Sequence, residues 1–427
     1  MKRLGLILAS TLFLTSPLAV GAVSDEDFAQ LRADFAALAE RFEQLAAENA
    51  ELRQANQQTA ATVVEIQETV VVEEPENWSE RIAVKGDFRY RYQNDELGSN
   101  LATALGDDDS RNRQRIRARA EISARLQSDL QVGFGMATGG DDPVSTNQTL
   151  GGGGSTKDVR LDLAYVDWSG LENTHIRGGK FKNTFQTVSK SQLQWDGDWR
   201  PEGLDARWDN GAFFAQGLGT WLESDSNSSN TEFSFILQGG ARAELAGIQL
   251  VGGLGYTEID TAGKPCFFEA DDFNFCGGNQ VDAGGNYLYD FEVYNVFGQA
   301  VFEAFGMPLA VFADFVKNDA ADEFDTGYLV GAKLGSAKKA GSWDVKYYYE
   351  DLESNATLGL LTNSDFGGGG TNGEGSVFSG SYAVTDQTKV KLSYYLVDRN
   401  SDNIGGILGG EEASFDTLQL DFNFKYK

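Results

Sequence analysis

Apolar and polar residues alternate one by one in many short runs along this chain. The last run, TLQLDFNFKYK at residues 417–427, has apolar side chains at even positions from Leu418 to Tyr426 and polar ones at odd positions from Gln419 to Lys425. Successive side chains of a β-strand point to opposite faces, so this pattern predicts a strand with one apolar and one polar face. Such a strand separates an apolar environment from water.

Sixteen segments show this alternation. They are residues 82–92, 113–126, 130–136, 159–165, 175–181, 203–208, 212–222, 231–245, 248–256, 289–305, 308–315, 327–335, 342–349, 376–384, 388–397 and 417–427. Turn residues such as Ala246-Gly247 follow even-numbered segments, and longer stretches such as 94–110, 138–156 and 353–375 follow odd-numbered ones. An even number of strands can close antiparallel, and closure is needed because an open edge in lipid leaves backbone groups unpaired. We therefore predict an all-β fold, a 16-stranded antiparallel transmembrane β-barrel over residues 80–427, with the long connections external.

Residues 1–22 have the features of a secretory signal peptide. Lys2 and Arg3 precede an apolar stretch, and small residues at Val20-Gly21-Ala22 suit cleavage. A membrane anchor helix is the alternative. It is disfavoured because polar residues interrupt the apolar run, which falls short of the ~20 residues that a spanning helix needs.

Residues 23–68 carry a different period. From Phe28 to Ile66, seam residues recur at alternating spacings of three and four, which predicts an N-terminal α-helical coiled coil. A single amphipathic helix packed against another part of the protein is the alternative. Pro75 ends any helix, so residues 69–79 are interpreted as a linker to the barrel.

The composition agrees with an exported membrane protein. The chain has 50 glycines, 28 phenylalanines and 15 tyrosines but only six prolines and two cysteines, which is typical of outer-membrane barrels with weak hydropathy signals. A net charge of −29 argues against a nucleic-acid partner. We expect the cell outer membrane of a Gram-negative bacterium, with lipid and lipopolysaccharide as neighbours, the N-terminal segment in the periplasm, and insertion by the barrel assembly machinery.

Several short motifs resemble the putative-porin family of Gram-negative bacteria. They are GDFRYRY at 86–92, RQRIRAR at 113–119, ATG at 137–139, STNQTLGG at 145–152, AYVDW at 164–168, GGKFKN at 178–183 and WDGDWRPEG at 195–203. The resemblance covers the first third of the barrel closely and the rest by pattern. It implies a general or selective diffusion channel and does not identify the solute.

Two neighbouring strands place a row of basic residues on their polar faces. These residues are Lys85, Arg89, Arg91, Arg113, Arg115, Arg117 and Arg119. A 16-stranded barrel leaves an aqueous lumen, so we expect these side chains to form a pore-lining basic wall. Ion pairs with inward carboxylates such as Asp162 and Asp205 are a second interpretation, compatible with the first.

The connection SKSQLQWDGDWRPEG at residues 189–203 is a candidate constriction. In trimeric porins of this size the corresponding loop folds into the lumen. Trp195 and Trp199 would pack it against the wall, and its acidic residues would face the arginines across the opening. These acidic residues are Asp196, Asp198 and Glu202. An ordinary external loop is the alternative.

Little else in the chain suggests chemistry. Cys266 and Cys276 are ten residues apart in an exported protein, which predicts a loop-stapling disulfide. The one histidine, His175, lies far from them in sequence and no acidic cluster has calcium-loop spacing, so we expect no metal and no cofactor. No nucleophile with a neighbouring base is evident, and we expect no catalytic residues and no enzyme activity.

The sequence therefore favours a trimeric porin for passive diffusion of small polar solutes or ions. The alternative is a structural outer-membrane anchor whose coiled coil contacts the periplasm or cell wall. Some 40 helical residues span only about 60 Å, which disfavours the anchor.

Overall fold

The computed structural model describes residues 78–105, 108–224, 232–267, 275–399 and 412–426, with a few helical positions between 33 and 53. The chain divides into two units, Met1–Glu76 and Asn77–Lys427. The predicted signal peptide, the linker as far as residue 77 and most of the predicted coiled coil lie outside the described residues. Within the described residues, no helix has the length and apolar character needed to cross a membrane.

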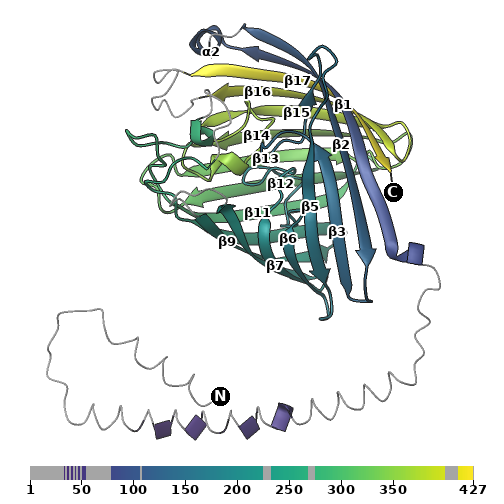
Figure 1. The fold of residues 1–427 in the computed structure, drawn as a ribbon, viewed down its shortest axis with the longest axis vertical. Helices are drawn as coiled ribbons and strands as arrows, with labels where there is room; N and C mark the ends of the chain where they lie inside the picture. The colour runs from purple at the N-terminus through teal and green to yellow at the C-terminus, as the bar shows by residue number, and fades with distance from the viewer. Residues whose placement is uncertain are drawn as a thin grey trace, which may run out of the picture. The chain divides into compact units, whose positions relative to one another are not determined.

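The second unit is a closed antiparallel β-barrel (Figure 1). Its strands are β1 Ile82–Leu97, β2 Ser110–Arg125, β3 Leu130–Thr138, β5 Val159–Trp168, β6 Thr174–Lys180, β7 Glu202–Asp209, β8 Phe213–Glu223, β9 Glu232–Leu245, β10 Ile248–Ile259, β11 Phe291–Ala304, β12 Met307–Asn318, β13 Thr326–Gly335, β14 Trp343–Leu352, β15 Gly373–Ala383, β16 Thr388–Arg399 and β17 Ala413–Tyr426. The two-residue strand β4, Gln148–Thr149, pairs only with β2. The predicted sixteen-stranded barrel is confirmed.

The barrel closes where its first strand meets its last. β1 pairs with β17 from Gly86 opposite Tyr426 to Leu97 opposite Phe415. A Cβ at Gly86 would lie 2.2 Å from the Arg119 carbonyl oxygen and 2.3 Å from the Tyr426 hydroxyl, so only glycine fits this seam. The Tyr426 hydroxyl donates a hydrogen bond to the Arg119 carbonyl at 3.0 Å, which ties the closing strand to β2.

The alternation of the sequence becomes the two faces of the wall. On β17, Phe422 and Phe424 are 37% and 42% exposed, whereas Gln419 and Asp421 are buried inside. Apolar side chains on the outer face of other strands, such as Leu254, are exposed in the same way. The outer surface therefore suits lipid, and the polar side chains point into the barrel.

The two ends of the barrel differ in their connections. Short connections join β2–β3, β5–β6, β7–β8, β9–β10, β11–β12, β13–β14 and β15–β16, and they lie at the end that also holds residues 82 and 426. We call this the turn end, and the opposite end, with the longer connections, the loop end. Ala246 and Gly247 both have positive φ, 52° and 79°, as a two-residue type I′ hairpin requires.

Among the described residues of the barrel, one short helix precedes β1 and the others lie in connections between strands. They are η1 Trp78–Arg81, α2 Ser99–Leu105, η2 Phe275–Gly278 and η3 Gly359–Leu361. The main hydrophobic cluster lies inside the barrel, between the wall and two connections that enter it. These connections determine the shape of the interior.

Candidate functional site

Residues 181–201, which join β6 to β7, lie inside the barrel; we call them inner loop 1. The Ser189 N–H and hydroxyl donate to Gln299 Oε1 on β11 at 2.8 and 2.7 Å. The Gln194 amide donates to Thr257 Oγ1 on β10 at 3.1 Å, and the Asp198 carboxylate reaches β2. Inner loop 1 therefore crosses the lumen from one wall to the other.

One side of inner loop 1 is apolar and fills part of the lumen. Trp195 stacks on Trp199 with ring centroids 4.9 Å apart, and Phe185 stacks on Trp195 at 6.4 Å. These rings belong to a buried cluster with inward side chains of β8 to β16, including Phe214 and Phe297. Among the described residues, β17 and β1 to β7 supply no buried member of that cluster, so the polar interior lies on their side.

Residues 353–372, which join β14 to β15, also enter the barrel; we call them inner loop 2. Asp365 accepts a hydrogen bond from Arg91 Nη1 on β1 at 2.8 Å. The Ser364 hydroxyl donates to the Val144 carbonyl at 3.1 Å. The connection is long and joins its strands at the loop end, as expected of connections after odd-numbered segments, but it folds into the barrel. Its serines, asparagines and threonines are polar like a solvated loop, but their hydrogen-bond partners are other parts of the protein.

The two inner loops are bonded to each other. The Asp196 N–H donates to the Leu361 carbonyl at 2.7 Å. In return, the Ser364 N–H and hydroxyl donate to Asp196 Oδ2 at 2.9 and 3.1 Å. Asp196 thus joins the two inner loops. The prediction that it faces the arginines is wrong.

Residues 260–267 and 275–290 cover inner loop 2 at the loop end; we call them the cap loop. The Asn279 side-chain amide donates to the carbonyls of Ser354 and Thr357 at 2.6 and 2.8 Å, and its oxygen accepts from the Gly359 N–H at 2.9 Å. A disulfide joins Cys266 to Cys276, with their Cα atoms 5.1 Å apart. The disulfide therefore constrains the segment that holds inner loop 2 down.

We expect the Cys266→Ser/Cys276→Ser variant to fold into the barrel but to lose protection of the cap loop. Closing a loop of this length removes about 3 kcal/mol of unfolded-chain entropy, and that constraint acts locally here. Limited proteolysis should cut the variant faster within residues 260–290. The wild type treated with a reducing agent should give the same pattern, and equal cleavage rates in oxidised wild type and variant would contradict the expectation.

The basic wall is held by carboxylates on neighbouring elements. Each pair has its nitrogen and oxygen between 2.6 and 3.5 Å apart, and the pairs are Arg91–Asp365, Arg91–Asp421, Arg113–Asp95, Arg117–Asp87, Arg119–Asp87, Arg117–Asp198 and Arg119–Asp198. The suggested partners Asp162 and Asp205 are wrong. They pair with Arg200 and Arg177, because those arginines are nearer on inner loop 1 and on β6.

Two of the acidic partners could have been found from the pattern. Asp87 lies on the polar face of the first strand with Arg89, and Asp421 lies on the polar face of the last. Closure of the barrel pairs these two strands, so both carboxylates had to lie near the arginines. The position of Asp365 near the arginines could not be predicted, because inner loop 2 has no alternation of apolar and polar residues that would assign its side chain to a face.

Arg89 and Arg115 are the least neutralised arginines of the wall. Arg115 donates to Gln93 Oε1 at 3.2 Å. Arg89 donates to Asn147, and its nearest carboxylate, that of Asp421, is 3.9 Å away. The Nε atoms of both arginines are buried without a hydrogen-bond partner. Excess positive charge is therefore concentrated at these two residues, midway along β1 and β2.

Two predicted residues lie away from the central network. Lys85 pairs with Glu121 at 3.1 Å near the turn end, and its side chain is 45% exposed. The prediction that Glu202 faces the arginines is wrong. Glu202 is the first residue of β7, shares a strand face with the exposed Leu204, and pairs with Lys180.

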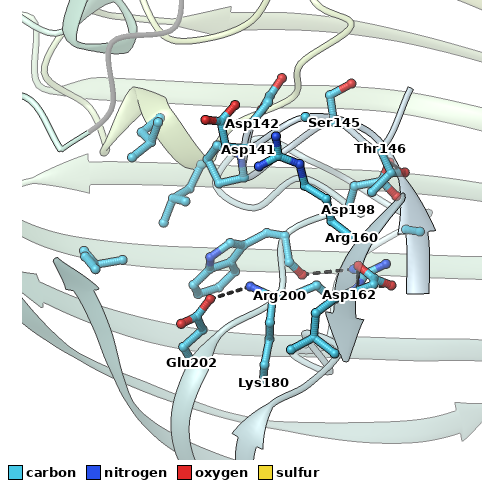
Figure 2. Close-up of a pocket in the computed structure, with 18 of the residues that line it drawn as sticks. Asp141, Asp142, Ser145, Thr146, Arg160, Asp162, Lys180, Asp198, Arg200 and Glu202 are labelled. Carbon is cyan, nitrogen blue, oxygen red and sulfur yellow. Dashed lines mark hydrogen bonds and ion pairs between the residues drawn. The ribbon is translucent and has the colours of Figure 1, made fainter. Parts of the chain in front are cut away.

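Two polar cavities lie on the arginine side of inner loop 1. The larger, of about 490 Å³, is lined by Asp141 and Asp142 on one side and extends on the other to Lys180 and Glu202, which lie on the outer face of β6 and β7 (Figure 2). The smaller, of about 230 Å³, is lined by residues nearer the turn end, including Lys85, Asp87 and Glu121. Both cavities are bordered by Asp162 and Arg200, which pair at 3.2 Å.

The junction of the cavities is electrostatically asymmetric. Burial opposes ionisation of Asp198, but Arg117 and Arg119 bring the pKa of that carboxyl below its usual range. Burial and the neighbouring Asp198 raise the pKa of Asp196. Asp198 is thus the acidic residue of inner loop 1 that keeps its negative charge beside the arginines. In the described part of the chain, no group of His, Cys, Asp and Glu side chains is arranged to hold a metal ion.

Comparisons with known proteins agree with this architecture. A family model described as a putative porin matches residues 99–235 and 285–426. Pseudomonas putida OprB at high pH aligns at 15% identity over 82% of this chain and 95% of its own, with a TM-score of 0.55. Salmonella typhi OmpF in complex with daunomycin aligns at 14% identity over 81% and 97%, with a TM-score of 0.47. No curated protein matches the chain.

Proposed function

Because the chain belongs to the putative-porin family, we propose that it is an outer-membrane porin through which small hydrophilic solutes and ions diffuse passively. The two polar cavities, which share Asp162 and Arg200 in their linings, carry this proposal. The apolar cluster behind inner loop 1 leaves the arginine side as the route for water and solute. Solute enters the larger cavity, passes the charged junction and leaves through the smaller one.

The constriction in this proposal is formed by β2 and inner loop 1. Arg117 and Arg119 on β2 bond Asp198 on inner loop 1 directly, at 3.5 and 2.7 Å, so these opposite charges are in contact and do not face each other across an opening. Arg89 and Arg115 supply the unbalanced charge. We therefore propose weak anion preference, which a net charge of −29 would not suggest, because charges inside the lumen outweigh distant surface charges.

Single-channel recording of the purified protein in a planar bilayer under a salt gradient tests the function. We propose a homotrimer, so conductance should rise in groups of three steps with a measurable reversal potential. A folded protein that inserts without conducting would overturn the porin proposal. The turn end is proposed to face the periplasm, which places the N-terminal segment there.

Arg115→Ala is expected to shift the reversal potential towards cation preference. The variant removes one of the two arginines that make no hydrogen bond to a carboxylate, so the basic wall of the lumen becomes less positive. Arg111→Ala is the matched control, because it removes the same charge from the exposed end of β2. An unchanged reversal potential in Arg115→Ala, or an equal shift in both variants, would rule out this assignment. The double variant Arg115→Ala/Arg117→Ala should shift further.

A further inference from the structure

Six lysines converge on the inside of the barrel near the turn end, beside the arginine wall: Lys425 is the cross-strand partner of Asp87, and Lys391 that of Asp421. We call them the lysine basin: Lys190, Lys333, Lys346, Lys389, Lys391 and Lys425. Five lie on the inner faces of β13, β14, β16 and β17, and Lys190 lies at the tip of inner loop 1. The cavities and pairs described above do not include them.

The strand register brings these lysines close together. Lys333 and Lys346 are direct cross-strand partners, a position where like charges destabilise a sheet. Lys389 and Lys391 are two residues apart on one face of β16, a separation of roughly 7 Å. Lys425 lies on the adjacent β17, two residues beyond the cross-strand partner of Lys389. These four strands therefore bring like charges together in a part of the sheet where their repulsion lowers stability.

The tip of inner loop 1 adds a sixth charge to the basin. Ser189 and Lys190 both have left-handed backbone conformations, with φ of 44° and 60°, which non-glycine residues adopt at a cost. Burial and the ammonium groups of Lys389, Lys425 and Lys333 lower the pKa of Lys190. The loop is thus held in a strained turn whose lysine lies within electrostatic reach of three others.

Few carboxylates neutralise the basin. Lys333 pairs with Asp344 at 3.3 Å. Lys346 donates to the Ser189 carbonyl at 3.0 Å and lies 4.5 Å from the centre of the Tyr348 ring. In the described parts of the chain, the other four lysines have no carboxylate oxygen within 4.0 Å. Asp421, opposite Lys391, is bonded to Arg91, and Glu350 lies further along β14.

Buried polar groups without partners border the basin on its inner side. Ser393 lies two residues beyond Lys391 on the same face and is the cross-strand partner of Gln419. Both side chains are 1% exposed, and neither the Ser393 hydroxyl nor the Gln419 amide oxygen and nitrogen has a hydrogen-bond partner. Buried polar atoms are nearly always satisfied in folded proteins. A hydroxyl and an amide N–H are therefore available beside the ammonium groups.

We propose that the lysine basin binds small polyvalent oxyanions, with inorganic phosphate as the simplest example. Lysine binds phosphate as a point charge, and a polyvalent anion can neutralise two or more ammonium groups that repel each other. Ser393 and Gln419 supply neutral donors for its remaining oxygens. This inference rests on the proposed porin function, and it places a retention site for anions on the turn-end side of the constriction.

Current recordings in potassium chloride with added inorganic phosphate test the inference on the full-length protein. Phosphate should reduce the chloride current of the wild type in a saturable way, and more strongly when added to the side of the turn end. Lys389→Ala/Lys391→Ala should raise the half-blocking phosphate concentration about tenfold if one of the two lysines bonds phosphate and about a hundredfold if both do, since each lost charge-assisted bond is worth roughly a factor of ten. Lys190→Ala changes no barrel strand and should weaken the block in the same direction.

Lys338→Ala/Lys339→Ala is the matched control, because both lysines are exposed in the turn between β13 and β14. It removes the same charge without touching the basin and should leave the block unchanged. If the wild type conducts but phosphate does not block its current, the phosphate site is overturned and the porin proposal stands. The same conclusion follows if the block is weakened equally in the control and the basin variants. A wild type that does not conduct would overturn both.

Discussion

Arg91→Ala is expected to lower the free energy of unfolding of the barrel by about 3 kcal/mol or more, because removing one partner of a buried ion pair leaves an uncompensated charge. Arg91 is 2% exposed and bonds two carboxylates. Its Nε and Nη2 donate to Asp421 at 2.7 and 3.0 Å, and its Nη1 donates to Asp365 at 2.8 Å. The alanine variant leaves the buried Asp421 and the partly buried Asp365 without this partner.

The temperature at which the folded band converts to the unfolded band on semi-native gels measures this loss. Arg111→Ala removes an exposed arginine from the neighbouring strand and should leave the transition nearly unchanged. The double variant Arg91→Ala/Asp421→Ala should recover part of the stability, since one orphaned charge is also removed. A transition in Arg91→Ala equal to that of Arg111→Ala would show that lumen water compensates for the lost pair.

Shortening inner loop 2 is expected to give the largest change in transport. Replacing residues 356–369 with a short glycine-serine link removes Asp365 and the part that bonds Asp196, and it widens the interior. Single-channel conductance should rise roughly twofold or more, because the narrowest cross-section limits ion flow through a pore. The measurement is the step size in potassium chloride.

A variant with a full-length inner loop 2 distinguishes the effect of the loop's volume on conductance from the effect of its hydrogen bonds. Ser364→Ala/Asp365→Ala keeps the full length of inner loop 2 but removes its side-chain bonds to Asp196, Val144 and Arg91. This variant should conduct with frequent fluctuations between two levels, whereas the shortened variant should conduct steadily at the higher level. Wild-type conductance in the shortened variant would show that inner loop 2 lies outside the ion path.

The barrel was predictable because its strands obey one local rule. Every strand has one face in an apolar environment and one inside, so its alternation can be recognised without any knowledge of its neighbours. Closure then follows from the cost of unpaired backbone groups in lipid. The seam glycine, Gly86, illustrates the limit, since its close approach to Arg119 and Tyr426 depends on strands far apart in sequence.

The interior was less predictable because its contacts are made by connections without periodicity. Glu202 shows that such predictions depend on where a strand begins. It is the first residue of β7, and a shift of one position along a strand moves a side chain from the inner to the outer face. Inner loop 2 shows the opposite problem. Its polar residues resemble a solvated loop, and only the partners supplied by Asn279, Asp196 and Arg91 allow it to enter the barrel.

The pairing of β1 with β17 has a consequence for the order of folding. Arg91 and Asp421 are separated by 330 positions along the chain, so their bond cannot form until the last strand has been added and the seam has closed. Contacts of such high sequence separation form late and slow the overall reaction. Inner loop 2, which uses the same arginine, cannot acquire its final anchor earlier. A nascent barrel would therefore remain wide and hydrated until its final strand is in place, and would narrow only afterwards.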